Sequence, residues 1–171
     1  NRSEIQMSTN IMELIKSKSS RAPRGGERGG SEDGDGKGNT LRYPKDLALD
    51  LEGNVYVLGL TPPSVFKIEP NGKTSLVLDE TGVQGHAFQS PSKIVIDSAN
   101  NKYVGSSSAI FNIPSFGETT VHLDFNPDLD LYKGVTHLQV DDFGNLYFIK
   151  GSGYSELYRY SVSNGLERVL G

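Results

Sequence analysis

The sequence predicts an all-β protein in which three successive four-stranded antiparallel sheets follow a short helix and a glycine-rich linker. A short segment occurs three times, as "DLEGNVYV" at 50–57, "DSANNKYV" at 97–104 and "DDFGNLYF" at 141–148. Consecutive copies start 47 and 44 residues apart, a period typical of repeats that each form one supersecondary unit. The copies lie among short runs rich in Val, Ile, Leu, Tyr and Phe that are separated by turn residues, which is the pattern of β-strands.

The first element is a short amphipathic helix, predicted at residues 1–18. Its apolar side chains recur at helical spacing and fall on one face: Met7, Ile11, Leu14 and Ile15. Ser3 and Gln6 have the spacing of a capping box, which favours a helix start. Isolated helices below about 12–15 residues are marginal in water, so we expect this helix to need a surface to lie on.

The second element is a flexible linker at residues 19–40. This stretch is rich in glycine and has no large apolar side chain, so burial cannot offset the entropy lost on ordering it. Within it, "DGDGKG" at 33–38 resembles a calcium-binding loop. Lys37 occupies a ligand position, however, and Pro44 stands where the bidentate glutamate belongs, so we interpret the stretch as a linker.

A nucleic-acid role for the linker is not favoured either. "RAPRGGERGG" at 21–30 resembles the arginine-glycine segments of some RNA-binding proteins. The acidic residues Glu32, Asp33 and Asp35 follow it closely, and the formal net charge of the chain is −4. A plain linker is the interpretation that we prefer, and a nucleic-acid partner is not expected.

The remaining elements are twelve strands in three units, at about 41–88, 89–132 and 133–171. The first unit reads "KDLALD", "NVYVLG", "SVFKIEP" and "TSLVLD". The second reads "SKIVID", "KYVGS", "AIFNIP" and "TVHLDF", and the third reads "THLQVD", "NLYFIK", "ELYRYSV" and "LERVLG". Turn residues between the runs predict that each unit is an antiparallel meander.

The repeated segment is predicted to be the first hairpin turn of each unit. Its aspartate ends the first strand, its Gly-Asn or equivalent pair makes the turn, and its tyrosine begins the second strand. We interpret the repeated aspartates as acceptors for nearby turn amides rather than as metal ligands: Asp50, Asp97 and Asp141. The repeated tyrosines are expected to pack between units: Tyr56, Tyr103 and Tyr147.

The repeats resemble the NHL repeat, a β-propeller blade. "YPKDLALDLEGNVYVLG" follows its order of proline, small-apolar strand, Asp, Gly-Asn and aromatic-Val, and "SVFKIEPNGKTSLVL" continues it into the outer strands. Pro91 fits in the second repeat, whereas Val135 replaces the proline in the third. The resemblance covers about 41–171 and implies propeller blades. NHL-like propellers include protein- and RNA-binding platforms, extracellular sensors, and enzymes of the lactonase and strictosidine-synthase type.

Three blades do not close a ring, since propellers have about 4–8. An open arc leaves the flank of each terminal blade uncovered, which favours association. We therefore expect the missing blades to come from a second copy, giving a six-bladed ring, or from a different chain, unless the chain is a piece of a longer protein. The N-terminal helix is expected to strengthen that association.

One polar constellation is predicted near the central channel. Asp46, Lys93 and His137 each stand four residues before the repeated aspartate of their unit, so they are expected to face the same region. Together they are able to bind a polar ligand or to move protons. The alternative is that they are freely varying polar positions at the wet ends of the strands.

Other chemistry finds little support in the sequence. The histidines His86, His122 and His137 match no metal-ligand spacing, and no nucleophile elbow, phosphate loop or zinc-protease motif is present. The chain has no cysteine and no apolar run of the roughly 18 residues that span a membrane. We therefore expect no catalytic residue, metal or cofactor, and the compartment stays open, with extracellular and periplasmic locations both compatible.

Two functions remain. The first is a non-catalytic module whose surface binds protein or ligand within an assembly. The second is a propeller enzyme of the lactonase or lyase type, as the resemblance also allows. Metal-dependent lactonases need several acidic and amide ligands from different blades, whereas these inner strands offer only Asp46 at the matching offset. That difference favours the binding module.

Overall fold

The computed structural model describes residues 41–125, 134–151 and 155–170, and all regular structure in these ranges is β-strand. The predicted helix and linker, with the calcium-like and arginine-glycine motifs, lie outside the described residues. The described strands are β1 (Pro44–Leu49), β2 (Val55–Leu60), β3 (Pro63–Ile68), β4 (Thr74–Leu78), β5 (Lys93–Ile96), β6 (Lys102–Gly105), β7 (Ala109–Ile113), β8 (Thr120–Asp124), β9 (Val135–Val140), β10 (Leu146–Lys150), β11 (Glu156–Ser161) and β12 (Gly165–Leu170). The predicted all-β fold is confirmed.

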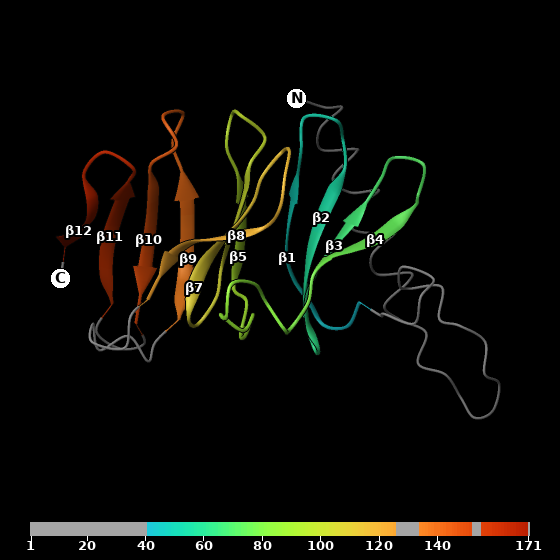
Figure 1. Cartoon of the computed structure of the whole chain (residues 1–171), viewed down its shortest axis with the longest axis horizontal. Coiled ribbons are helices and arrows are strands. Elements are labelled where there is room, and N and C mark those ends of the chain that lie inside the picture. Colours follow the sequence, from blue (N-terminus) through green and yellow to red (C-terminus); the bar gives the residue numbers. More distant parts are fainter. Residues whose placement is uncertain (1–40, 126–133, 152–154, 171) are drawn as a thin grey trace.

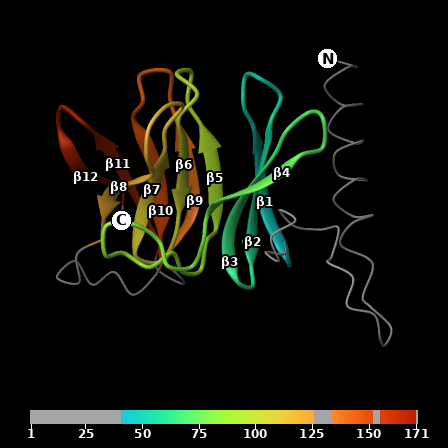
Figure 2. The ribbon, with the colours of Figure 1, turned by 45° about the vertical axis from the view of Figure 1, so that its right-hand side comes forward.

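The strands form three separate antiparallel sheets, each following chain order: β1-β2-β3-β4, β5-β6-β7-β8 and β9-β10-β11-β12. We call them blade 1, blade 2 and blade 3. Their first strands, β1, β5 and β9, lie next to one another, and the later strands fan outward from them (Figure 1, Figure 2). The meander order within each blade is as predicted. No helix in the described ranges is long and apolar enough to cross a membrane.

Blades 1 and 3 share a bulge in their first strand as well as a topology. In blade 1 the pairing of β1 with β2 shifts between Pro44 and Asp46. In blade 3 the pairing of β9 with β10 shifts between the equivalent residues Val135 and His137. A bulge inserts one unpaired residue and re-aims the side chains beside it. The repeated sequence therefore reproduces the same local backbone irregularity two blades apart.

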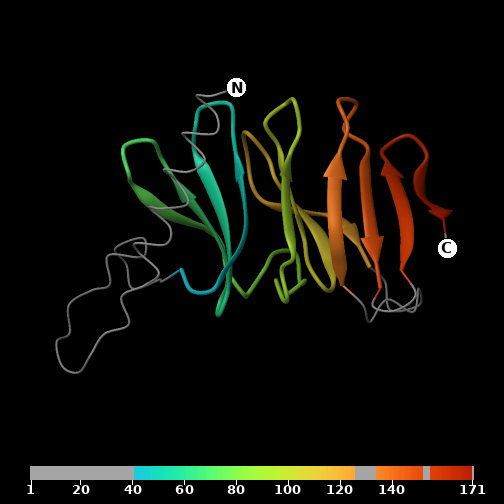
Figure 3. The ribbon, with the colours of Figure 1, turned by 180° about the vertical axis from the view of Figure 1, so that it is seen from behind.

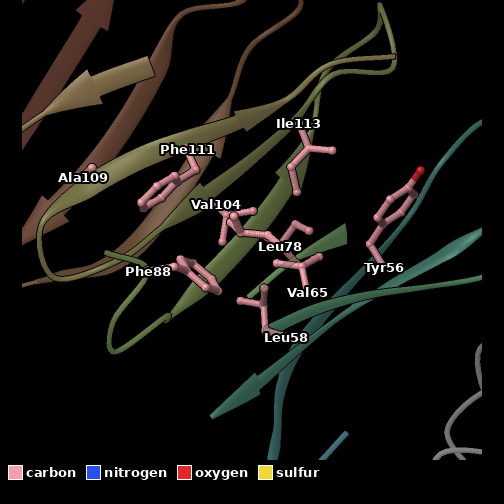
Figure 4. Close-up of a cluster of buried hydrophobic side chains, with 10 residues drawn as sticks. Tyr56, Leu58, Val65, Leu78, Phe88, Val104, Ala109, Phe111 and Ile113 are labelled. Atoms are coloured by element: carbon pink, nitrogen blue, oxygen red, sulfur yellow. The ribbon is translucent and has the colours of Figure 1, made fainter. Parts of the chain in front are cut away.

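Neighbouring blades pack through two apolar clusters. The first joins blade 1 to blade 2, with Tyr56, Leu58 and Val65 against Val104 and Phe111, as Figure 4 shows. Each side chain of this size contributes about 1.5–3 kcal/mol when it is fully buried. Phe88, in the connection between β4 and β5, completes the cluster by packing edge-to-face on Phe111, with ring centroids 5.3 Å apart.

The second cluster joins blade 2 to blade 3. Tyr103 and Ile110 of blade 2 meet Leu138, Leu146 and Phe148 of blade 3. Side chains alternate between the two faces of a strand, so these clusters define two faces for every blade. The front face points to the next blade along the chain, and the back face points to the preceding blade.

The two terminal flanks differ from each other. On the back face of blade 1, Val57 and Phe66 are 0% and 1% exposed. On the front face of blade 3, Tyr147, Ile149 and Leu157 are half-buried, and this flank lies at one end of the arc (Figure 3). We expected both flanks to be bare. That expectation is wrong for the centre of the blade 1 back face, where Val57 and Phe66 are buried, although Leu49 on the same face is 40% exposed.

Candidate functional site

The three repeated aspartates make the same set of hydrogen bonds. In the first turn, Oδ1 of Asp50 accepts from the backbone amides of Glu52 and Asn54, at 3.1 and 2.8 Å, and Oδ2 accepts from Nδ2 of Asn54 at 2.8 Å. Asp97 with Asn101 and Asp141 with Asn145 repeat this arrangement. The structure thus places each aspartate at its turn as an acceptor for nearby amides.

The turns also require one residue with a positive φ. Gly53 has φ 81° and Gly144 has φ 79°, whereas the second turn uses Asn100 at φ 66°. Asparagine tolerates this conformation better than most residues because its short polar side chain bonds locally. Asn100 uses that side chain to reach the neighbouring blade, since its Nδ2 donates to Oε2 of Glu52 at 2.5 Å.

The repeated tyrosines lie above these turns on the front faces. The hydroxyl of Tyr103 donates to Oδ2 of Asp97 at 3.1 Å, and that of Tyr147 donates to Oδ2 of Asp141 at 3.5 Å. Burial, together with the neighbouring carboxylate, raises the pKa of Tyr103 to about 12. Tyr56 and Tyr103 belong to the two interblade clusters, whereas Tyr147 is on the flank of blade 3.

A buried lysine faces the first of these sites. Nζ of Lys102, on the back face of blade 2, lies 4.0 Å from Oδ2 of Asp50 and 4.8 Å from the centre of the Tyr56 ring. Burial lowers the pKa of Lys102, although Asp50 opposes the shift. Burial would raise the pKa of Asp50, but hydrogen bonds from Asn54 and the charge of Lys102 outweigh it and hold that pKa below 3.8.

The predicted channel constellation is only partly assembled. Asp46 on β1 accepts from the backbone amide of Ile94 on β5 at 3.0 Å, and its other oxygen pairs with Nζ of Lys93 at 3.3 Å. His137 is exposed and its Nδ1 lies 3.2 Å from Oγ1 of Thr136. Within the described ranges, no hydrogen bond or ion pair joins His137 to Asp46 or Lys93. Asp46 and Lys93 therefore link blades 1 and 2, and His137 stands apart.

Two basic side chains between blades 2 and 3, the buried Lys150 and the half-buried His122, were not predicted as site residues. Lys150 is buried without a hydrogen-bond partner, with Nζ 3.6 Å from the centre of the Phe125 ring, and burial lowers its pKa to about 8. His122 packs between the rings of Tyr103 and Tyr160. Its Nε2 also lacks a partner, and burial lowers the pKa of His122 although Asp97 opposes the shift. The only sequence signal for either residue was strand alternation.

Metal-binding geometry is not found in the part of the chain that the structure describes, where no three His, Cys, Asp or Glu side chains are grouped to hold an ion. The nearest approach to a catalytic pair is His86 with Asp124, whose Nδ1 and Oδ1 atoms lie 3.5 Å apart. Both side chains are partly exposed. This pair on its own supplies neither a nucleophile nor an oxyanion site.

Solved structures with the same architecture place the three blades in a known fold. Virginiamycin B lyase from Staphylococcus aureus matches 74% of this chain with a TM-score of 0.58 and 17% identity. A gluconolactonase-like protein matches 82% with a TM-score of 0.57 and 18% identity. An extracellular domain assigned to a hybrid two-component system of B. thetaiotaomicron matches 78%, with a TM-score of 0.57 and 18% identity. The fold is a β-propeller.

The likeness covers only part of each propeller. The chain spans 41% of the lyase, 52% of the gluconolactonase-like protein and 17% of the extracellular domain. No family model and no curated protein matches the sequence. The solved structures show the propeller fold. The more specific NHL assignment stays a prediction from the repeat motif.

Proposed function

We propose that this chain is a non-catalytic propeller module that binds protein surfaces and holds them in an assembly. The supporting observation concerns Asp46, the one acidic residue at the predicted channel offset of the inner strands. Both of its carboxylate oxygens are engaged within the protein, one by the amide of Ile94 and one by Lys93. Asp46 therefore fastens blade 1 to blade 2, and the amine of Lys93 balances its charge, so that the described contacts of this carboxylate are structural.

The repeated aspartates support the same proposal. Each accepts three hydrogen bonds from its own turn, through both carboxylate oxygens. Hydrogen bonds to the charged form stabilise the carboxylate, and the pKa of Asp141 is lowered chiefly by the side chain of Asn145. These aspartates serve the hairpins and are not free to carry out proton transfer.

A propeller enzyme of the lyase or lactonase type is the second candidate. Two of the similar structures carry such names, a lyase and a gluconolactonase-like protein. Identities of 17% and 18% support the fold and transfer no activity. The buried, unpartnered amine of Lys150 has an environment that resembles that of an activated residue, but it is enclosed between blades.

Elemental analysis of the purified 171-residue chain, followed by a gluconolactone hydrolysis assay, separates the two functions. The binding module predicts no metal near one equivalent per chain and no hydrolysis above the buffer rate. Asp46→Asn is the matched variant, because it preserves size while removing the charge. Stoichiometric metal, with hydrolysis that is lost in the chelated protein and in Asp46→Asn, would establish the enzyme.

A further inference from the structure

We propose that one end of the three blades is a docking surface for a basic protein segment that carries apolar side chains between its lysines and arginines. This surface, the hairpin end, consists of the turns that follow the first and third strands of each blade: 50–54, 69–73, 97–101, 114–119, 141–145 and 162–164. The proposal rests on the binding-module function proposed above and names the chemistry of the partner.

The topology brings these six turns to one end of the molecule. Each blade is an antiparallel meander, so its first and third turns leave the sheet at the same end. The first strands of the three blades lie next to one another, and the turns gather at the top of Figure 1 and of Figure 3. Asp46 and Lys93 lie near the starts of β1 and β5, so the hairpin end is separate from the predicted channel constellation.

The four most exposed large apolar side chains in the described ranges all lie on the hairpin end. They are Phe116, Phe143, Val162 and Leu51, which are 93%, 90%, 86% and 78% exposed, and they come from four different turns. Single exposed apolar side chains are ordinary on a protein surface. Their collection on one end, with at least one from every blade, indicates instead a surface that another molecule covers.

The charge of the hairpin end decides the kind of partner. Its turns contain seven Asp and Glu side chains and one cation, Lys73. The formal charge of this end is therefore −6, against −4 for the whole chain. Glu118 and Asp142 are exposed and stand within two residues of Phe116 and Phe143 in the sequence. A partner that covers these phenylalanines must also meet the carboxylates, so lysine and arginine side chains on the partner are favoured.

The same charge argues against two other occupants. The carboxylates would be repelled by the negative potential of an anionic membrane surface. A second copy that presented its own hairpin end would bring like charges together. A basic segment with apolar side chains gains from both the charge and the apolar contact.

Hydrogen bonds between turns hold part of the hairpin end in place before any partner binds. The backbone amide of Leu51 in blade 1 donates to Oδ1 of Asn100 in blade 2 at 3.4 Å. The backbone amide of Ser115 donates to Oδ1 of Asn101 at 3.3 Å. Leu51 and Phe116 are therefore presented from turns that are tied to their neighbours, which reduces the conformational freedom lost on binding.

A synthetic peptide tests the chemistry of the partner. We would measure the fluorescence anisotropy of a short fluorescein-labelled peptide of alternating arginine and leucine, titrated with the 171-residue chain. Two control peptides replace every arginine by glutamate or every leucine by serine. The basic apolar peptide is expected to bind at least about tenfold more tightly than either control. Equal binding of the three peptides, or no binding of the first, would overturn the proposal.

Matched variants of the chain locate the bound peptide. Phe116→Ser combined with Phe143→Ser is expected to weaken its binding at least about tenfold. The control combines Tyr43→Ser with Leu170→Ser, at the opposite end of the blades, where the original side chains are 70% and 66% exposed. This control should leave the affinity unchanged. An equal loss in both double variants, or a loss in neither, would contradict the assignment.

A second measurement keeps all of the apolar side chains. The sequence has no cysteine, so Ala99→Cys in the 97–101 turn and Ala87→Cys in the connection between β4 and β5 each introduce one thiol at an exposed position. An environment-sensitive dye is attached to each thiol. The basic apolar peptide is expected to change the emission of the dye at position 99 and not that at position 87. Any other pattern would mean that the peptide binds elsewhere, and the proposal would be wrong.

Vesicles and light scattering test the other occupants. Phosphatidylcholine vesicles, with and without phosphatidylserine, are expected not to carry the chain down on sedimentation. The particle mass from light scattering should be the same for the original chain and for Phe116→Ser with Phe143→Ser. Vesicle binding or self-association that this double variant loses would assign the end to a membrane or to a second copy and overturn the proposal. The metal and gluconolactone assays bear on the proposed function alone, so a catalytic result there would leave these peptide outcomes separately readable.

Discussion

Nζ of Lys102 and Oδ2 of Asp50 face each other at 4.0 Å between blades 1 and 2, and the two side chains are only 4% and 1% exposed. The carboxylate is also held by three hydrogen bonds from its own turn. Among the described residues, the amine of Lys102 has this ion pair and the face of the Tyr56 ring, and the charges of Glu52 and Asp97 also favour its protonated form. Removing Asp50 would therefore leave the buried charge of Lys102 without its ion pair. Removing Lys102 would leave Asp50 with its three hydrogen bonds, so we expect the loss of the aspartate to destabilise the fold more.

We expect Asp50→Ala to lower the free energy of unfolding by about 3–5 kcal/mol, since it leaves a buried lysine unpaired and opens the turn. Lys102→Met is expected to lower it by less than half as much, because the turn still satisfies Asp50 and a buried charge is removed. Urea denaturation of both variants measures the difference. Asp79→Ala, at a more exposed turn without a cation, is the control and should cost about 1 kcal/mol. The reverse order of the first two variants would contradict this account.

Acid should weaken the contact between blades 2 and 3 through His122. Its folded pKa is lowered by burial, whereas the unfolded chain binds the proton with a pKa of about 6.5. The contribution of neutral His122 to the free energy of unfolding is fully present above about pH 6.5. It falls as the pH drops toward the folded pKa, by at most about 1.4 kcal/mol per pH unit. His122→Phe preserves the packing on Tyr103 and Tyr160. It should make the urea midpoint depend less on pH between pH 7.5 and 5. The control His137→Gln should show the same dependence of the urea midpoint on pH as the original chain. If His122→Phe also shows that dependence unchanged, His122 is not the responsible group.

Burial of Lys150 should make the stability of the fold depend on pH in the alkaline range. Its folded pKa is about 8 and that of an unfolded lysine is about 10.4, so protonation opposes folding. The penalty, about 3 kcal/mol, is complete below pH 8 and disappears as the pH rises toward 10.4. Lys150→Met should therefore be more stable than the original chain at pH 7, with the gain shrinking by pH 10. Calorimetric melting of both proteins tests this, and a gain that is constant with pH would show that the charge is not responsible.

The two equivalent front-face positions should differ in their tolerance of charge. Leu58→Asp buries a carboxylate in the first cluster and should cost at least about 4 kcal/mol. Ile149→Asp, on the half-buried flank, should cost about 1 kcal/mol or less. The urea midpoints of the two variants of the 171-residue chain compare them directly. Similar large losses would indicate that something in the chain already packs on Ile149.

Strand positions and the repeated turns were predictable from the sequence because they depend on local signals. Alternation and turn residues located all twelve described strands, and the turn position of the repeated aspartates predicted that they accept hydrogen bonds from nearby amides. Lys102 and Lys150 were missed because a lysine in a strand usually faces solvent, and only the arrangement of blades shows that these two point inward. His137 was grouped with Asp46 and Lys93 by its offset. The same offset shows that residues hold equivalent positions in different blades. Whether their side chains meet also depends on which blades are adjacent.

The closed turn of each repeat divides its residues into two groups with different freedom to change. Aspartate and asparagine fasten the loop to itself, so the side chains at the tip take no part in holding it shut. Leu51 and Phe143, which follow Asp50 and Asp141 by one and two residues, are 78% and 90% exposed. Exposed tip side chains such as Leu51 and Phe143 are thus able to be replaced without opening the turn, which would alter what the rim of the propeller presents while the scaffold beneath it stays the same.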